Sequence, residues 1–322
     1  MTNKNNRIKI VVPGDYPLQI KDSGHLDRLE TFGDVILYDN LPVNKEDQIE
    51  RVKEADVIIN TRSSVKWTES DLRKLPKLQL ITTCSIGTDM IDLAAANELG
   101  ISVCNQPGRT SRVVAEHIFG LMFAVAKRAA YQTAQLKSGN WQRMENIYLH
   151  GKTIGIIGTG NIGTELAKLS KAVGMKVLAW TFNPSESKSR EIGISYVTLD
   201  RLLSLSDVVS LNVRLSKETH KLIGKREFKS MKQGAILING GRGDLVDTDA
   251  LVNSLNSNHL AGAGLDVFDT EPLPANHPIL LCDQVVLTPH MADQTPEGME
   301  LLNEGAVDNV IRFLEGRSQN IV

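Results

Sequence analysis

Three side chains that together suit proton and hydride chemistry follow three successive apolar segments late in the chain. Arg242 follows A-I-L-I-N, Glu271 follows A-G-L-D-V, and His290 follows V-V-L-T. Continuous apolar segments of this kind are typical of parallel strands covered on both faces. In open α/β sheets, ligands bind beyond the carboxyl ends of the strands. We therefore expect the three side chains to lie close together at that edge of one sheet.

This trio suits the interconversion of a secondary alcohol and a carbonyl group by hydride transfer with a nicotinamide. The imidazole of His290 titrates near neutrality and can take the hydroxyl proton, while a neighbouring Glu271 would raise its pKa and fix its tautomer. The guanidinium of Arg242 can fork onto a carboxylate beside the reacting carbon. The implied substrate is a 2-hydroxy or 2-keto acid. Taken singly, Arg242 could instead pair with Asp244, Glu271 could be solvated, and His290 could be structural.

A glycine-rich turn between a strand and a helix predicts a dinucleotide site. Residues 153–163 read T-I-G-I-I-G-T-G-N-I-G. Gly158, Gly160 and Gly163 stand where a tight turn, a close approach of pyrophosphate and close helix packing need small residues. The following helix would offer free N–H groups and a partial positive charge to the phosphates. Because the context is strand, turn and helix, we favour this interpretation over a purely structural turn.

The elements that position these residues alternate between strand-like and helical segments along the whole chain. This alternation predicts an α/β protein with two Rossmann-like or flavodoxin-like parallel-sheet domains. The amphipathic segment after residue 295 has no strand behind it, so we expect it to return to the first domain. The cofactor domain is then inserted into the substrate domain. We expect a substrate (catalytic) domain of residues 1–107 and 293–322, and an NAD(P)-binding Rossmann domain of residues 108–292.

Composition narrows the class of protein further. The chain has 322 residues and a formal net charge of -2, which gives no reason to expect nucleic acid or an anionic membrane as a partner. No apolar run approaches the roughly 20 residues of a membrane span, and residues 1–7 lead into a strand rather than a signal-peptide core. Cys84, Cys104 and Cys282 are scattered, which favours a reducing, cytoplasmic setting and predicts neither disulfides nor a metal site.

These motifs, in this order, resemble the D-isomer-specific 2-hydroxyacid dehydrogenases over essentially the whole chain. The similar segments are I-G-T-D-M-I-D-L-A-A-A-N-E-L-G-I-S-V-C-N-Q-P-G (86–108), V-A-E-H (114–117), G-T-G-N-I-G (158–163), N-G-G-R-G-D-L-V-D (239–247), G-L-D-V-F-D-T-E-P-L (264–273) and T-P-H (288–290). The resemblance implies that Arg242 binds the substrate carboxylate and that His290 is the acid/base, paired with Glu271. A glutamate rather than a glutamine at this place argues against formate oxidation. Family members are usually homodimers, so we expect a homodimer.

The resemblance also implies further contacts. Asp266 would hold the nicotinamide carboxamide, and the backbone of Ser85, Ile86 and Gly87 would close over the substrate carboxylate from the other domain. The residues assigned to the cofactor site are Gly158, Gly160, Asn161, Ile162, Gly163, Thr181, Asn183, Arg214, Thr219, Asn239, Gly240 and Asp266.

One position departs from the NAD-specific pattern. The strand K-V-L-A-W ends in Thr181, where an acidic residue would hold the ribose hydroxyls of NAD. Thr181 and Asn183 could bond either cofactor, Lys188 could attract a 2′-phosphate, and Arg214 could reach one or lie in solvent. We expect NAD or NADP to be accepted, with a slight preference for NADP.

The identity of the substrate stays open. Arg62 follows an apolar strand and could bind a second anionic group of the substrate or pair with a surface acid. The sequence does not choose among glyoxylate, hydroxypyruvate, longer 2-keto acids and phosphorylated ones. Two other functions remain: a dinucleotide-binding sensor or corepressor-like protein without turnover, and oxidation of a non-carboxylate anion such as phosphite.

Overall fold

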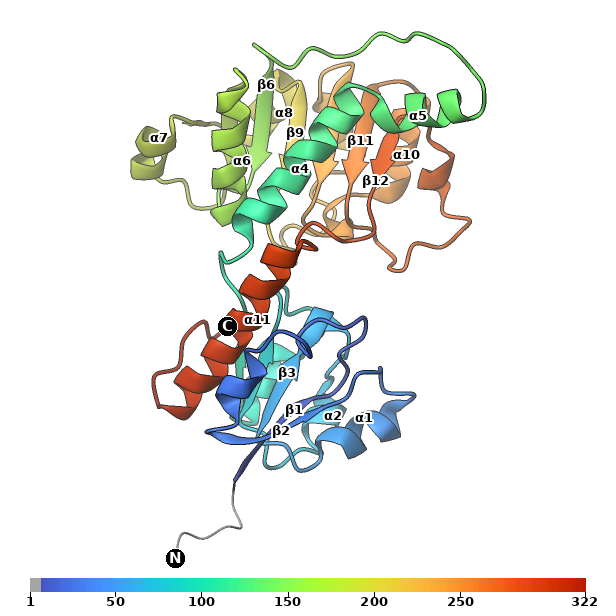
Figure 1. Ribbon diagram of the computed structural model, residues 1–322. Helices are drawn as coiled ribbons and strands as arrows, with labels where there is room; N and C mark the ends of the chain where they lie inside the picture. Colours follow the sequence, from blue (N-terminus) through green and yellow to red (C-terminus); the bar gives the residue numbers. More distant parts are fainter. Residues whose placement is uncertain (1–6) are drawn as a thin grey trace, which may run out of the picture. The chain divides into compact units, whose positions relative to one another are not determined.

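A computed structural model of the protein describes residues 7–322, and the chain in it divides into two compact units (Figure 1). Unit 1 comprises the chain up to Thr110 and again from Gln294 to Val322, whereas unit 2 comprises Ser111–Asp293. Unit 2 thus begins at Ser111, where we expected residue 108, and ends at Asp293, where we expected 292. Residues 1–6, which bear on the expected absence of a signal peptide, lie outside the described residues.

Unit 1 contains a parallel sheet of five strands in the order β2-β1-β3-β4-β5. This is the flavodoxin-like order, in which helices cover both faces. The strands are β1 (Ile8–Val12), β2 (Gly33–Leu37), β3 (Val57–Asn60), β4 (Leu80–Thr83) and β5 (Ser102–Cys104). The helices are η1 (Leu26–Leu29), α1 (Lys45–Val52), η2 (Thr61–Ser63), α2 (Glu69–Leu72), α3 (Leu93–Glu98) and α11 (Pro296–Leu314).

Helix α11 belongs to unit 1 although it comes last in the chain. Thr295 caps it by accepting a hydrogen bond from the N–H of Gly298, and Pro296 stands in its first turn. Its buried face, which includes Leu302 and Val310, joins a core cluster with strand residues such as Ile10. The C-terminal segment therefore returns to the first domain, as its amphipathic pattern predicts.

Unit 2 contains a parallel sheet of seven strands in the order β12-β11-β10-β9-β6-β7-β8. The strands are β6 (Thr153–Ile157), β7 (Lys176–Trp180), β8 (Ser195–Tyr196), β9 (Val208–Leu211), β10 (Ala235–Asn239), β11 (Leu260–Leu265) and β12 (Val285–Leu287). The helices are α4 (Ser111–Ala126), α5 (Ala129–Lys137), α6 (Asn161–Ala172), α7 (Glu186–Ile192), α8 (Leu199–Leu205), α9 (Lys225–Ser230), η3 (Gly243–Leu245), α10 (Thr248–Asn256) and η4 (Pro278–Leu281). The predicted α/β class with two parallel-sheet domains is confirmed.

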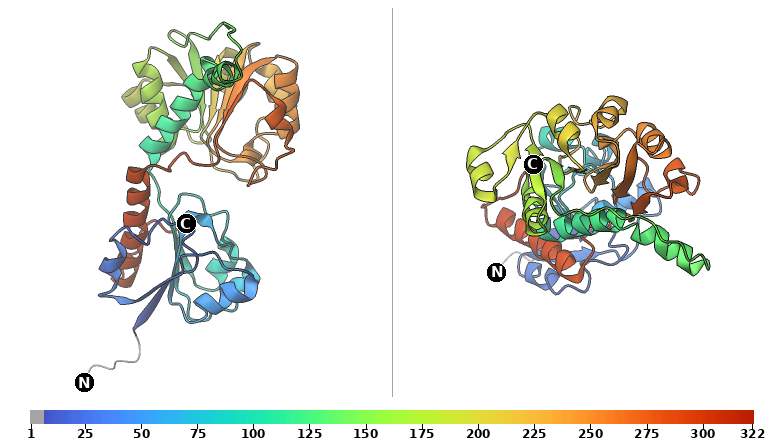
Figure 2. Two further views of the ribbon diagram at one scale, coloured as in Figure 1. Left: turned by 45° about the vertical axis from the view of Figure 1, so that its right-hand side comes forward. Right: turned by 90° about the horizontal axis from the view of Figure 1, so that it is seen from above.

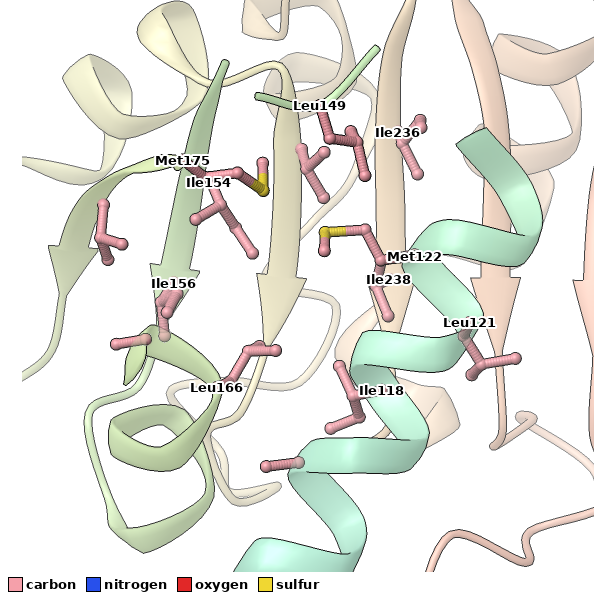
Figure 3. Close-up of a cluster of buried hydrophobic side chains, with 14 of the residues drawn as sticks. Ile118, Leu121, Met122, Leu149, Ile154, Ile156, Leu166, Met175, Ile236 and Ile238 are labelled. Atoms are coloured by element: carbon pink, nitrogen blue, oxygen red, sulfur yellow. The ribbon is translucent and has the colours of Figure 1, made fainter. Parts of the chain in front are cut away.

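Both faces of this sheet are buried, as the continuous apolar strands predict. Helices α4 and α6 cover one face, and α8, α9 and α10 cover the other (Figures 1 and 2). Along β10, Ile236 and Ile238 point into the first cluster and Leu237 into the second. Figure 3 shows Ile118 and Met122 of α4 in the first cluster, beside strand residues of β6 and β10. A helix as apolar as α4 is therefore a core element of this unit.

The strand order reverses between β6 and β9, since the chain runs outward from β6 to β8 and then from β9 to β12. Such a switch point leaves a crevice at the carboxyl ends of the strands, where open α/β sheets bind ligands. The glycine-rich turn follows β6, and the candidate side chains follow β10, β11 and β12. Across residues 7–322, no helix combines the length and apolar character needed to cross a membrane.

Candidate active site

His290 and Glu271 meet at the carboxyl ends of β12 and β11. The Nδ1 atom of His290 lies 2.7 Å from Oε2 of Glu271, and the backbone N–H of Phe268 donates to Oε1 of the same carboxylate at 2.9 Å. The carboxylate is thus held from two sides. The His290 side chain remains 48% exposed, and Nε2 is the ring nitrogen that Glu271 does not engage.

The charges around this pair favour its ionised state. The hydrogen bond to Glu271 raises the pKa of His290 above the ordinary histidine value, against the opposing effects of burial and of the Arg242 charge. Burial works to raise the pKa of Glu271, but the bonds from His290 and Phe268 and the nearby positive charges bring it below the usual glutamate value. A pair of this kind can hold a proton on the imidazole near neutral pH and transfer it to an acceptor on a bound molecule.

Arg242 belongs to the same cluster. It lies three residues beyond the end of β10, and its Nη1 donates to the carbonyl of Gly241 at 2.8 Å. Its charge lowers the pKa of both Glu271 and His290, so the three groups lie within electrostatic reach of one another. The side chain of Asn239 shapes this turn, because its Nδ2 donates to the Arg242 carbonyl at 2.8 Å and its Oδ1 accepts from the N–H of Gly241 at 3.0 Å.

The turn after β6 has the shape that a bound pyrophosphate requires. Gly158 has a φ of +96°, and a Cβ there would lie 2.7 Å from the backbone of Asn212. A Cβ on Gly163 would lie 2.0 Å from the Gly158 carbonyl oxygen, which is closer than any side chain permits. By contrast, a Cβ on Gly160 would meet none of the described atoms within 4 Å. The turn is tight where the chain needs it and open at the N-terminus of α6, where Gly160 has no side chain to cap the free N–H groups.

Comparison with known proteins agrees with this geometry. Residues 119–292 match the family described as D-isomer specific 2-hydroxyacid dehydrogenase, NAD binding domain. The chain is 36% identical over 298 residues to a glyoxylate reductase from Korarchaeum cryptofilum, covering 90% of each protein. It is 40% identical over 277 residues to a glyoxylate reductase from Thermococcus litoralis, covering 83% of each. This chain is a D-isomer-specific 2-hydroxyacid dehydrogenase.

A solved structure extends the likeness to the whole dehydrogenase. A glyoxylate reductase from Paecilomyes thermophila matches with a TM-score of 0.89 at 26% identity, covering 98% of each chain. The recognition of the family from its ordered motifs is therefore confirmed, as is its two-domain fold.

The remaining residues that the sequence assigns to the cofactor site follow strands of the same sheet. At the end of β7, Thr181 is half-buried and Asn183 is exposed, and Arg214 is exposed after β9. Thr219 is buried, and its hydroxyl donates to the Arg214 carbonyl at 2.8 Å and accepts from the N–H of Ser216 at 2.7 Å. Gly240 lies under α4, where a Cβ would come within 2.7 Å of the Ile118 side chain. The structure therefore gives Thr219 a clear role in closing a turn, and the cofactor contacts of these residues stay predictions.

Asp266 is buried and its carboxylate is fully engaged. Oδ1 accepts from the Thr288 hydroxyl at 2.6 Å and from the N–H of Met291 at 2.9 Å, and Oδ2 accepts from the N–H of Ala292 at 3.0 Å. Burial works to raise the pKa of Asp266, but the contact with His117 and the bonds from Met291 and Thr288 bring it below its usual value. Asp266 therefore anchors the segment that carries His290, and its expected contact with a carboxamide stays a prediction.

In unit 1, the loop after β4 is braced by its own unit. The Ser85 carbonyl accepts from the Thr83 hydroxyl at 2.9 Å and the N–H of Gln106 at 3.0 Å. The Gly87 carbonyl accepts from the Ser85 hydroxyl at 2.9 Å, and the carbonyl of half-exposed Ile86 accepts from the Asn105 side chain at 2.8 Å. Carbonyls held in this way are typical of a loop that presents N–H groups. Its role toward a substrate stays a prediction.

Arg62 lies in a short helical turn after β3, with a positive φ of 51°. Its Nε donates to the Pro17 carbonyl at 2.9 Å, and Nη1 contacts the side-chain oxygen of Gln294. Nη2 lies 3.8 Å from the sulfur of Met299. The guanidinium thus bonds largely within unit 1, to a backbone carbonyl and to residues at the start of α11. These contacts explain its position without a surface acid or a substrate group.

Sequence reasoning missed two contributors to the site. Thr288 bonds to Asp266, and His117 of α4 lies 3.0 Å from the Thr288 hydroxyl. The T-P-H and V-A-E-H segments containing them were identified, but their pairing links positions 171 residues apart. A polar residue within such an apolar helix was the available signal.

Proposed function

We propose that this dehydrogenase reduces a small 2-keto acid to the D-2-hydroxy acid, with His290 as the acid/base and Arg242 as the carboxylate-binding residue. The observation that carries the proposal is the 2.7 Å contact between His290 and Glu271, at the strand edge that also bears Arg242. The retained trio weighs against a sensor without turnover, because binding alone would not need an acid/base pair.

Each residue has a defined task in the proposed reaction. A bound reduced nicotinamide supplies the hydride. Arg242 binds the substrate carboxylate by a forked, charge-assisted pair, which orients the carbonyl. The protonated His290 donates from Nε2 to the carbonyl oxygen as the alcohol forms, while Glu271 keeps the proton on Nδ1 and stabilises the imidazolium. In the oxidation direction the neutral imidazole takes the proton back.

For the substrate, we propose an acid with one anionic group, of the glyoxylate or hydroxypyruvate size. Arg62, the residue that could have bound a second anion, already donates to a backbone carbonyl and contacts Gln294. Two of the matched relatives are glyoxylate reductases, which agrees with a small substrate. A phosphorylated 2-keto acid would require Arg62 to give up those bonds.

For the cofactor, we propose relaxed choice with a slight preference for NADPH. The end of β7 carries Thr181 instead of an acid, so nothing at that position repels a 2′-phosphate. The ammonium of Lys188 in α7 donates to the Thr159 carbonyl at 2.8 Å, which places a cation beside the glycine-rich turn. Lys188→Ala would therefore weaken NADPH binding more than NADH binding. A preference of the unmodified protein for NADH of about a hundredfold, which is about 2.7 kcal/mol, would contradict this proposal.

The deciding experiment is a screen of 2-keto acids with NADH and with NADPH, followed by absorbance of the reduced nicotinamide. Turnover of glyoxylate to glycolate, or of hydroxypyruvate to D-glycerate, supports the proposal. Cofactor binding without turnover on any keto acid would favour a sensor instead. Reduction of the oxidised cofactor by phosphite would favour oxidation of a non-carboxylate anion.

We further propose a homodimer that forms through the segment after α4. Helix α5 buries none of its residues, and Trp141 and Tyr148 beyond it are 81% and 70% exposed. Figure 1 shows this segment extending from α4 and running back to β6 around the amino ends of the strands. Exposed aromatic side chains at such density are typical of interfaces. A sedimentation mass of one chain would contradict the dimer, and Trp141→Glu should lower the association constant. A cytoplasmic location is proposed as well, supported by three cysteines that form no disulfide.

A further inference from the structure

A histidine on the apolar helix α4 contacts the segment that carries His290. His117 Nε2 lies 3.0 Å from the hydroxyl oxygen of Thr288 and 3.3 Å from Oδ1 of Asp266. The His117 side chain is largely buried and that of Asp266 almost entirely so. All three residues lie within unit 2, at the carboxyl ends of β11 and β12. The reaction proposed above makes no use of His117.

The hydrogen bonds fix where the protons lie. The Thr288 hydroxyl has one proton and donates it to Asp266 Oδ1 at 2.6 Å, since the bonds that the carboxylate accepts keep it ionised. The hydroxyl oxygen must therefore accept from His117, so Nε2 of His117 carries a proton. His117, Thr288 and Asp266 form one directed chain in which every contact has a donor and an acceptor.

The hydrogen-bonded series of His117, Thr288 and Asp266 ends at a strained stretch of backbone. His290 has a φ of 49°, in the left-handed region that a side chain other than glycine enters at a cost. Its N–H donates to the Asp266 carbonyl at 2.7 Å, and the next two N–H groups, of Met291 and Ala292, donate to the Asp266 carboxylate. Such a conformation persists only where its surroundings over-determine it. Asp266 does this for three successive residues.

We propose that His117 is a positioning residue for the reduction: through Thr288 and Asp266 it fixes the turn 288–292 that carries His290. This inference rests on the proposed function and adds a residue to it. His117 does not touch the reacting atoms. It fixes Asp266 from the helix side, and Asp266 in turn holds the backbone that aims the imidazole.

The contact of His117 with Asp266 also matters for the groups around His290. These are Glu271 from the loop after β11, Arg242 from the turn after β10, and Asp266. The Asp266 charge raises the pKa of His290, whereas the Arg242 charge lowers it. When His117 is removed, the Asp266 charge loses a partner and acts more strongly on His290. The pH at which reduction declines should then move upward.

The test compares His117→Leu with His117→Gln, whose amide retains an N–H donor. In the leucine variant, the loss of a buried bond should speed hydrogen exchange of the backbone amides at 290–292 by about tenfold and lower kcat by about tenfold. The KM for the keto acid should change by less than about twofold, because Arg242 is untouched. The glutamine variant should restore most of the slow exchange at 290–292 and most of kcat. A structural role alone would not shift the pH profile of kcat.

His259→Leu is the matched control. His259 is another partly buried histidine of unit 2, and its ring nitrogens lie 2.9 Å from the Phe228 carbonyl and 3.1 Å from Gln233, at the amino ends of β10 and β11. It should lower stability without changing exchange at 290–292 or the pH profile. Unchanged exchange at 290–292 in His117→Leu, or the same change in His259→Leu, would overturn the inference.

Exchange also separates the inference from the proposed function, because it needs no turnover. If the unmodified protein reduced no keto acid, the proposed function would fail. Faster exchange at 290–292 in His117→Leu would then still support the anchoring of the turn, and unchanged exchange would overturn that too.

Discussion

Two of the histidine–carboxylate pairs in unit 2 lie in the segment after β11, and they differ in how open the imidazole is. His290 pairs with Glu271 at 2.7 Å, and His277 pairs with Asp269 at 3.2 Å. The side chain of His290 is 48% exposed, whereas that of His277 is 10% exposed. A histidine beside a carboxylate is therefore not by itself a candidate acid/base.

The second ring nitrogen makes the difference. Nδ1 of His277 accepts a hydrogen bond from the N–H of Ile279 at 3.3 Å and so caps η4, while Asp269 also accepts from the Thr248 hydroxyl at 2.6 Å. Both nitrogens of His277 are thus occupied. The cavity beside it measures about 20 Å³, which is room for a water molecule and not for a keto acid. His290 instead uses Nδ1 for Glu271 and has a half-exposed side chain.

The largest expected effect separates the two pairs. His290→Asn should lower kcat for keto-acid reduction by about 10³-fold, because the variant has no acid of suitable pKa. Thermal unfolding should move little, since the side chain is half-exposed. Steady-state kinetics and a melting curve measure both. Retention of more than about a tenth of the activity would mean that another group supplies the proton.

Arg242→Ala should have the next largest effect, on the order of a hundredfold in kcat/KM, because a charge-assisted fork onto the substrate carboxylate is lost. The affinity for the reduced cofactor, measured by nicotinamide fluorescence, should stay nearly intact. If cofactor affinity fell as far as kcat/KM, the role assigned to Arg242 would be wrong. Arg242→Lys tests the fork itself, since an ammonium keeps the charge without the paired donors.

Glu271→Gln should lower kcat by about tenfold and also shift its pH dependence. Reduction needs the imidazolium, and the hydrogen bond to Glu271 raises the pKa of His290. Activity in this direction is therefore full below the raised pKa and is lost as pH rises through it. Without the carboxylate the pKa of His290 falls, so the decline moves to lower pH. A profile that does not move would show that Glu271 leaves the pKa of His290 unchanged.

The smallest effect on activity is expected at the second pair. His277→Asn should lower the free energy of unfolding by about 1–2 kcal/mol through the lost bonds to Asp269 and Ile279. Its kcat should stay within about threefold of the unmodified protein. Urea denaturation and the same kinetic assay give both values. A loss of kcat comparable with that of His290→Asn would erase the distinction between the pairs.

The closeness of His290 and Glu271 can be predicted from the sequence because it follows from the order of the strands in the sheet. Glu271 and His290 each follow a buried strand, β11 and β12 are neighbours in one parallel sheet, and their carboxyl ends must meet. The tight turn at Gly158 can also be predicted, because it depends on glycines that are close together in the sequence.

Other features depend on packing that periodicity does not encode. The sequence identifies α4 as an apolar helix, but not the rotation that directs His117 at Thr288. Likewise, nothing in the sequence of α7 reveals that Lys188 bonds to Thr159. Whether the Arg62 side chain bonds within its own unit depends on the Pro17 carbonyl and on Gln294. Both lie far from Arg62 along the chain.

The place of α11 has a consequence for how the protein is made. One face of the sheet of unit 1 is covered by residues of Pro296–Leu314, including Leu302, Ala306 and Val310. On the ribosome, β1 to β5 emerge first, yet this apolar face lacks the part of its cover that α11 supplies until the whole of unit 2 has been translated. Unit 2, by contrast, is continuous and can complete its core as it leaves the exit tunnel. The domain that is started first is thus the one finished last, and in the interval its bare strands are the part of the nascent chain that most needs a chaperone.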